Sequence, residues 1–179
     1  GRRAQAGPAR AKRALLARPL MRVLTVGNMY PPHHQGGYEL VWQACVAELR
    51  AHGHDVRVLT TDHREAGVAE PDEPGVYREL RWYWRDHEFP RLGALARWRL
   101  EHANARCFAR HVEEFRPDAL AWFAMGGMSL GLLEAGRGRG LPALSVACDD
   151  WVSYAPLVDQ WTRLWAMRPR LARVAGALT

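Results

Sequence analysis

The sequence predicts an α/β fold: a Rossmann-like, doubly wound and mostly parallel sheet with helices on both faces. Short apolar runs alternate with amphipathic stretches along residues 22–175, and this order of strands and helices builds such a sheet. With 179 residues and 48% hydrophobic content, the chain can bury one sizeable core and is too short for two ordinary domains. We therefore expect one domain, which spans residues 21–179.

The first three expected elements form a βαβ unit. Residues 22–28 contain a compact apolar run that closes on a Gly-Asn pair, which is typical of a buried strand. A helix should follow and end at Gly53, because an apolar stripe spaced i, i+3, i+4 and i+7 occurs at Trp42, Cys45, Val46 and Leu49. Residues 56–61 predict a second buried strand. The two strands should be parallel, with a right-handed connection.

The later part of the chain continues the alternation. The polar, acidic stretch 62–75 predicts an exposed loop, and the aromatic-rich run 77–84 predicts a third strand. Residues 92–115 predict a long helix that Pro117 stops. Two more strands and two more helices are then expected, with the strands at 119–124 and 144–147 and the helices at 129–135 and 161–175.

In a doubly wound sheet, ligands bind outside the carboxyl ends of the strands. Four loops of the expected fold lie at those ends, namely residues 28–37, 61–62, 125–129 and 148–154. Any functional site should therefore be built from these loops.

The charge of the chain lies mostly in a basic tail, residues 1–20. The net charge is +6, but six of the 25 basic residues precede Met21, and the 19 that remain are balanced by 19 acidic ones. The tail is expected to be disordered because it has too little apolar content to bury. Its Arg-rich, acid-free character is also found in organelle transit peptides, although those are usually rich in Ser, which this tail lacks. Without the tail no basic patch remains, so nucleic-acid binding is not expected.

Other features of the composition suggest a cytoplasmic bacterial protein. No apolar stretch approaches the roughly 20 residues of a membrane span. Cys45, Cys107 and Cys148 lie far apart without a C-x-x-C pair, as expected for free thiols in a reducing compartment. Lys12 is the only lysine among many arginines, a bias that we associate with a GC-rich genome.

The loop after the first strand, PPHHQGGYE (residues 31–39), carries the most informative motif. It matches neither the G-x-G-x-x-G dinucleotide fingerprint nor a P-loop. Gly36 and Gly37 precede a helix, where backbone N–H groups suit a phosphate, but two glycines also simply permit a sharp turn. Adjacent His33 and His34 lack the further ligands of a metal site. We expect no metal, and we prefer a catalytic or substrate-contacting role for His33 or His34.

Two further pairs lie at the same expected edge. Asp149 and Asp150 follow the strand at 144–147, and because neighbouring side chains at a strand end point in opposite directions, we expect one functional aspartate at most. The other would cap the next segment. Gly126 and Gly127 provide either a ligand contact or a strand-to-helix turn.

Aromatic residues accompany the two aspartates. Trp151 and Tyr154 either line a sugar pocket or close the core.

Two segments carry a resemblance to a known family. MRVLTVGNMYPPHHQGGYELVWQACVAELRAHGHDVRVLTT (residues 21–61) resembles the opening of glycosyltransferase family 4 enzymes of the GT-B fold, with its strand, YPP…GG loop, helix and GHDV strand. PDALAWFAMGGMSLGLLEAGRGRGLPALSVACDDW (residues 117–151) is similar to the family's fourth strand, glycine turn, short helix and fifth strand. The resemblance covers about residues 21–165.

The resemblance implies a transferase that moves a sugar from a nucleotide-sugar donor to an acceptor hydroxyl, usually with retention and without a metal or other cofactor. Such enzymes have two Rossmann-like domains that face each other across a cleft, and the amino-terminal one mainly receives the acceptor. The role of a donor-phosphate and acceptor loop carries over to His34, Gly36, Gly37, Tyr38 and Glu39. A lipid-linked acceptor would allow peripheral association with a membrane.

This sequence departs from the family pattern in two ways. The family often has His-Asp after the fifth strand, with the histidine near the reacting sugar, whereas here Asp149 and Asp150 hold those positions. Asp149 is therefore the candidate catalytic residue, while Gly126, Gly127, Asp150 and Trp151 are candidates for lining the cleft. The family's donor-binding second domain has no counterpart in these residues.

We therefore expect an isolated amino-terminal half of a hexosyltransferase-like enzyme, inactive by itself. The alternative from another class is a stand-alone, non-catalytic α/β module that binds a phosphorylated or sugar ligand. The reading frame downstream of Thr179 would discriminate between them.

Overall fold

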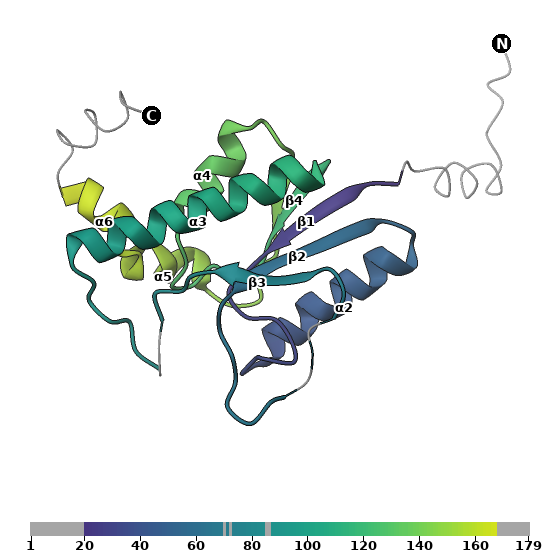
Figure 1. The fold of residues 1–179 in the computed structure, drawn as a ribbon, viewed down its shortest axis with the longest axis horizontal. Coiled ribbons are helices and arrows are strands. Elements are labelled where there is room, and N and C mark those ends of the chain that lie inside the picture. Colours follow the sequence, from purple (N-terminus) through teal and green to yellow (C-terminus); the bar gives the residue numbers. More distant parts are fainter. Residues whose placement is uncertain (1–19, 70, 72, 85–86, 168–179) are drawn as a thin grey trace, which may run out of the picture.

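The computed structural model describes residues 20–69, 71, 73–84 and 87–167 (Figure 1). Within them, five strands form one sheet: β1 (Arg22–Val26), β2 (Asp55–Thr61), β3 (Val76–Leu80), β4 (Ala119–Trp122) and β5 (Ala143–Ser145). The helices are α2 (Gly37–Ala51), α3 (Ala94–Phe115), α4 (Gly131–Gly138), α5 (Trp151–Val158) and α6 (Gln160–Met167).

The sheet has the strand order β3-β2-β1-β4-β5, and every pair of neighbouring strands is parallel. This arrangement confirms the predicted Rossmann-like fold. The chain runs from β1 outward to β3 and then returns to β4, so the order reverses between β1 and β4. This reversal is the topological switch point, where α/β sheets of this kind bind ligands.

Alternating side chains of the strands build a separate core on each face of the sheet. Leu24 packs on one face with Phe108 of α3 and Leu132 of α4. Val23 packs on the opposite face with Trp42 of α2. Helices therefore cover both faces, with α3 and α4 on one side and α2 on the other (Figure 1).

The face that carries α2 also has an apolar groove of about 1120 Å³. The groove lies between α2 and the strands, and its lining includes Val41, Cys45, Phe123, Leu144 and Val146. Two of these side chains are well exposed, Val41 at 41% and Leu144 at 56%. This part of the sheet is therefore less completely covered than the face under α3.

Helix α2 is held against the sheet by an aromatic contact. Trp42 stacks on Phe123 with ring centroids 5.0 Å apart. A Cβ atom on Gly27 would lie 2.6 Å from the Trp42 ring, so the ring's position requires glycine there. After the carboxyl end of α2, Gly53 has a φ of +84°, which confirms the predicted left-handed residue after the helix.

The third strand is shorter than the sequence pattern suggests. We expected a strand over residues 77–84, but β3 ends at Leu80. Beyond it, the backbone of Arg81 bonds to the buried side chain of Asn104: the Arg81 N–H donates to Oδ1 at 2.7 Å, and Nδ2 donates to the Arg81 carbonyl at 2.8 Å. The side-chain amide of Asn104 on α3 thus forms hydrogen bonds with both backbone groups of Arg81.

The carboxy-terminal helices also differ from the expectation. Helix α5 was not predicted, because residues 148–154 were expected to form a loop at the edge of the sheet. The helix begins at Trp151, inside that stretch. The helix predicted at 161–175 is confirmed for residues 161–167, which belong to α6. Residues 168–175 lie outside the described residues. Among the helices that the structure describes, none combines the length and the apolar character needed to cross a bilayer.

Candidate functional site

The loops after β1, β2 and β4 meet at the carboxyl edge of the sheet, as predicted. Asn28, which follows β1, connects them: its N–H donates to the carbonyl of Ala124 at 2.9 Å, and its side-chain amide donates to the carbonyl of Gly126 at 3.5 Å. The hydroxyl of Thr60 in β2 donates to the Asn28 carbonyl at 3.0 Å. The edge is thus a connected surface built from segments about 100 residues apart.

The loop between β1 and α2 is folded back on itself. Tyr30 and His33 form an antiparallel bridge around the cis peptide bond between Pro31 and Pro32. Tyr30 and His33 are both buried. The His33 Nδ1 atom accepts a hydrogen bond from the N–H of Glu65 at 3.2 Å, so His33 joins this loop to the one after β2. This bond gives His33 a structural role, and a substrate contact from it stays a prediction.

His34 is in a different position from its neighbour. It is half-buried, and its Nδ1 atom, although shielded from solvent, has no hydrogen-bond partner among the described residues. A shielded ring nitrogen without a partner is costly. Of the two histidines, His34 is therefore the one that a ligand could contact, and its predicted role in binding stays a prediction.

Gly36 and Gly37 do not have the backbone conformation that demands glycine. Gly36, the N-cap of α2, is extended with φ −142° and ψ −175°, and Gly37 has no positive φ. A sharp turn alone therefore does not explain the pair. A Cβ atom on Gly36 would lie 3.3 Å from the Glu39 carboxylate, whereas one on Gly37 would meet no atom within 4 Å. The space in front of Gly37 is open.

Glu39 already occupies part of the helix N-terminus. Its Oε2 atom accepts a hydrogen bond from the Gly36 N–H at 3.1 Å, and the residue is buried. A carboxylate is stabilised there by the partial positive charge of the helix start. Glu39, which we expected beside a ligand phosphate, therefore places its own carboxylate at the helix start. A ligand phosphate would have to bind the N–H groups that follow Gly36.

Tyr38 connects α2 to the segment after β5. Its hydroxyl donates a hydrogen bond to the carbonyl of Val146, and Trp151 Nε1 donates to the same carbonyl at 3.5 Å. Burial raises the pKa of the Tyr38 hydroxyl to about 12. Tyr38 is therefore a neutral donor that fixes the distance between α2 and the start of α5.

The two aspartates after β5 are exposed, and both lie at the start of α5. Asp149 Oδ1 accepts a hydrogen bond from the N–H of Trp151 at 3.1 Å. Asp150 is the N-cap residue of α5 but makes no capping bond with its side chain. The capping role expected for one of the pair thus falls to Asp149, the proposed catalytic residue, and its catalytic role stays a prediction. Trp151 is only 4% exposed and packs in the core. The expected place of Asp150 and Trp151 in the lining of a cleft stays a prediction.

Gly126 and Gly127 are buried at the end of β4. A Cβ atom on Gly126 would lie 2.1 Å from the hydroxyl of Tyr154, and one on Gly127 would lie 2.5 Å from the ring of Phe89. Gly127 also has a φ of +69°. Packing and backbone conformation therefore explain both glycines without a ligand, and their expected place in the lining of a cleft stays a prediction.

Sequence reasoning missed a polar pocket of about 520 Å³ next to the end of β2. Residues 62–66 line it together with Gln35, Trp84 and His87. The stretch 62–75 was expected to be merely an exposed loop. The signal that could have found the pocket is the aromatic run at residues 82–84, which continues beyond the strand toward the same edge.

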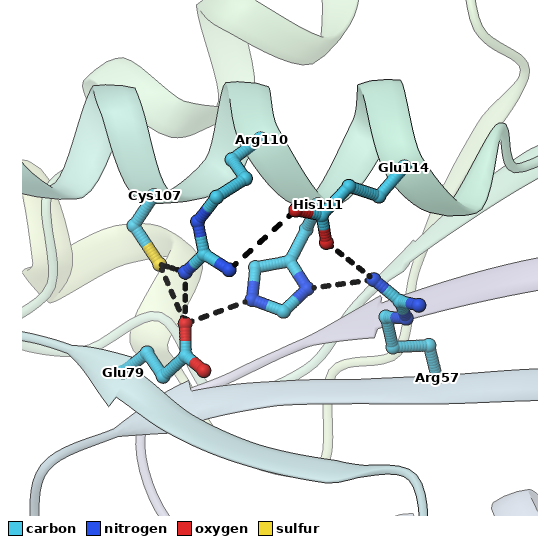
Figure 2. Close-up of polar contacts among 6 residues, drawn as sticks. All are labelled: Arg57, Glu79, Cys107, Arg110, His111 and Glu114. Carbon is cyan, nitrogen blue, oxygen red and sulfur yellow. Dashed lines mark hydrogen bonds and ion pairs between the residues drawn. The ribbon is translucent and has the colours of Figure 1, made fainter.

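A second cluster of polar side chains lies away from this edge, between the sheet and α3 (Figure 2). Glu79, Cys107 and His111 place their potential ligand atoms within 4.8 Å of one another. However, Arg110 forms an ion pair with Glu79, and Arg57 lies 3.1 Å from the Nδ1 atom of His111. A cation would have to displace one guanidinium and tolerate the other, so these charges suit a salt-bridged network better than a metal site.

The same cluster fixes the protonation of His111. Because a guanidinium can only donate, His111 Nδ1 is the acceptor from Arg57, and Nε2 carries the hydrogen that is donated to Glu79 at 3.1 Å. Burial lowers the pKa of His111. Burial would raise the pKa of Glu79, but hydrogen bonds from Arg110 and His111 outweigh it and lower that pKa. The cluster therefore combines a neutral imidazole with an ionised carboxylate.

Comparison with known proteins places the chain in a family. Among curated protein sequences there is no match. A similar solved structure is MurG of Acinetobacter baumannii, with 20% sequence identity and a TM-score of 0.49 over 70% of this chain and 34% of that one. The chain thus spans about a third of the length of that protein. The family model described as "Glycosyl transferase 4-like domain" matches residues 36–179, and the chain belongs to this family.

Proposed function

We propose that this chain is the acceptor-side domain of a retaining glycosyltransferase that uses a nucleotide-sugar donor. Family membership supports glycosyl transfer in general. The observation that carries the finer proposal is the open space in front of Gly37, at the first residue of α2 and beside the switch point of the sheet.

The first turn of α2 offers donors for a diphosphate. The first N–H groups of a helix have no partner within the helix, and they carry its partial positive charge. Because Gly37 lacks a side chain, a phosphate oxygen can reach these groups closely. Glu39 takes the N–H of Gly36, so we assign the phosphate to the N–H groups of Gly37 and Tyr38.

The proposed transfer has a simple atom balance. The oxygen of the acceptor hydroxyl forms a bond to the anomeric carbon of the donor sugar, and the bond from that carbon to the phosphate oxygen breaks. The nucleoside diphosphate leaves with the electron pair and takes up the hydroxyl proton. The N–H groups at the start of α2 would stabilise the negative charge that develops on the leaving diphosphate. We propose no metal and no other cofactor for this step.

Asp149 and His34 are the proposed side-chain contributors near the reacting sugar. Asp149 is exposed at the start of α5, where Tyr38 connects that helix to the glycine loop through Val146. His34 supplies a shielded ring nitrogen in need of a partner. If the acceptor is linked to a lipid, the protein would also associate peripherally with a membrane.

The test replaces Gly37 with valine and measures nucleoside diphosphate release. Because the proposal places the donor-binding domain outside these 179 residues, the assay uses the protein that carries both domains, with a panel of UDP-, GDP-, ADP- and dTDP-sugars. The variant should fold, since the new side chain has room. Gly37→Val should lower turnover at least tenfold, which corresponds to about 1.4 kcal/mol of lost phosphate stabilisation.

Gly93→Val is a matched control. Gly93 is the N-cap of α3, and a Cβ atom there also meets nothing within 4 Å. Turnover should be unchanged in this variant. Wild-type turnover in Gly37→Val would refute the assignment of the phosphate site, and the absence of nucleotide release from every donor would refute the transferase proposal.

A further inference from the structure

A pocket of about 440 Å³ lies between the segment that leads into α3 and the junction of α5 with α6. Three arginines line it, Arg91, Arg97 and Arg163. Among the described residues, no carboxylate lines the pocket, and none of these guanidinium groups forms an ion pair. The balance of 19 basic and 19 acidic residues after position 20 therefore hides a local excess of positive charge.

Arg97, in the first turn of α3, has a fixed position in the pocket wall. Its Nη1 donates a hydrogen bond to the carbonyl of Gln160 at 3.0 Å, and its Nη2 donates to the carbonyl of Leu92 at 2.9 Å. Its Nε has no hydrogen-bond partner among the described residues. The two carbonyls orient the guanidinium but do not neutralise its charge. The start of α3 adds a partial positive charge, and its first turn contains no acidic residue.

Hydrogen bonds join the two walls of the pocket. Gln160 Nε2 donates to the carbonyl of Pro90 at 2.6 Å, and its Oε1 accepts from the N–H of Leu92 at 3.0 Å. Arg163 Nη1 donates to the carbonyl of Leu157 at 3.0 Å. Helix α6 lies beside α3 (Figure 1). The pocket is therefore preformed, although its walls come from segments about 70 residues apart.

A neighbouring carboxylate, that of Asp159, does not cancel this charge. Asp159 is 1% exposed and does not line the pocket. Its Oδ2 accepts a hydrogen bond from the N–H of Leu130 at 3.0 Å, and its Oδ1 accepts from the N–H groups of Trp161 at 3.0 Å and Thr162 at 2.6 Å. These bonds hold the carboxylate in the protein interior. Even its full charge would leave two of the three positive charges without a counter-charge.

These walls suit a phosphate monoester. A guanidinium presents paired N–H donors that match the oxygens of a phosphate. A phosphate monoester carries about two negative charges at neutral pH, which matches the excess charge of the pocket better than a single carboxylate does. The volume is within the range of ligand pockets and leaves room for the esterified group. Phe89 and Leu157, 40% and 67% exposed, give that group an apolar wall.

We propose that this pocket binds a phosphate monoester whose esterified group is apolar next to the phosphate, and that Arg91, Arg97 and Arg163 hold its oxygens. The same chemistry occurs in soluble organic phosphates and in the head group of phosphatidic acid, and the experiment separates these two sources. No residue of the loop at 31–39 lines this pocket. The inference therefore goes beyond the proposed function and does not depend on it.

Isothermal titration calorimetry of the 179-residue chain with phenyl phosphate tests the soluble source. A salt concentration of about 0.15 M limits the screening length to about 8 Å, so distant charges contribute little. Arg91 is exposed and has no hydrogen bond or ion pair with another described residue, so Arg91→Glu should fold normally. It should weaken binding about tenfold or more. Arg97→Lys keeps the charge but loses the paired N–H groups, and it should weaken binding by a similar factor.

Arg106→Glu is the matched control. Arg106 is also an exposed arginine of α3, and it does not line this pocket. Its reversal changes the net charge of the protein by the same amount as Arg91→Glu. The affinity for phenyl phosphate should therefore stay within about twofold of the wild type. Phenyl sulfate, which has a similar shape but only one negative charge, should bind the wild type more weakly than phenyl phosphate does.

Co-sedimentation with phosphatidylcholine vesicles that contain phosphatidic acid tests the lipid source. Binding of phenyl phosphate that Arg91→Glu weakens and Arg106→Glu preserves supports a site for soluble phosphates. Sedimentation that depends on Arg91, without binding of phenyl phosphate, supports a site for the lipid head group. The proposal is refuted if neither probe binds, or if Arg106→Glu weakens binding as much as Arg91→Glu does. Neither result changes what nucleotide release shows about glycosyl transfer.

Discussion

Glu101 should make the stability of this protein fall as the pH rises toward neutrality. This residue of α3 is 8% exposed, and its Oε1 atom accepts a hydrogen bond from the hydroxyl of Tyr83 at 2.5 Å. Burial raises the pKa of the Glu101 carboxyl from 4.5 to about 7. The bond from Tyr83 and one with Ser129 oppose the shift, whereas the nearby charge of Asp159 adds to it.

The direction and size of the effect follow from proton linkage. Between pH 4.5 and 7 the folded protein keeps the Glu101 proton, while the unfolded chain has released it. Stability falls with rising pH wherever the folded state binds more protons. A shift of one pKa unit corresponds to about 1.36 kcal/mol, so the free energy of unfolding should lose about 3 kcal/mol between pH 4.5 and pH 8 through this group.

Glu101→Gln isolates this contribution. The glutamine carbonyl can still accept the bond from Tyr83, and the side chain stays neutral at every pH. Urea unfolding of wild type and variant at pH 4.5, 6, 7 and 8 gives the difference in unfolding free energy. That difference should move in favour of the variant by about 3 kcal/mol from the lowest pH to the highest. A difference independent of pH would refute the reasoning.

Two stability predictions concern the segments that shape the edge of the sheet. Asn104→Ala should lower the free energy of unfolding by about 2 kcal/mol or more, because both backbone groups of Arg81 lose their side-chain partner; an unchanged urea midpoint would contradict this. Gly127→Ala should lower the free energy of unfolding more than Gly67→Ala does, by about 1 kcal/mol or more, in the same assay. Both glycines have positive φ, but only at Gly127 would the new methyl group meet a ring, at 2.5 Å. Equal losses in the two variants would show that backbone strain alone matters.

The first βαβ unit could be predicted because its signals are local. The apolar run of β1 and the stripe that includes Trp42 and Val46 depend on residues within one element, and burial of that stripe forms the helix. Gly53 marks the end of the helix by a conformation that few other residues adopt. Once these elements were known, the parallel pairing of β1 and β2 followed from connection rules.

Helix α5 could not be predicted in the same way. Its sequence contains Pro156, which opposes a helix interior because it lacks an N–H donor. What favours the helix is tertiary packing, since Trp151 and Ala155, one turn apart, are 4% and 1% exposed in the core. The end of β3 depends similarly on a distant residue, Asn104, whose amide takes the backbone groups of Arg81.

The candidate site shows most clearly where local patterns stop being informative. Gly36–Gly37 and Gly126–Gly127 look alike in the sequence, and both follow a strand at the same edge of the sheet. Their surroundings are opposite: a Cβ atom on Gly37 meets open space, whereas one on Gly126 would collide with Tyr154. The same glycine pair thus serves packing in one loop and leaves room for a ligand in the other. The difference depends on a side chain 28 residues further along the chain, and for this reason Gly37, not Gly126, is the position at which a substitution should affect binding before it affects folding.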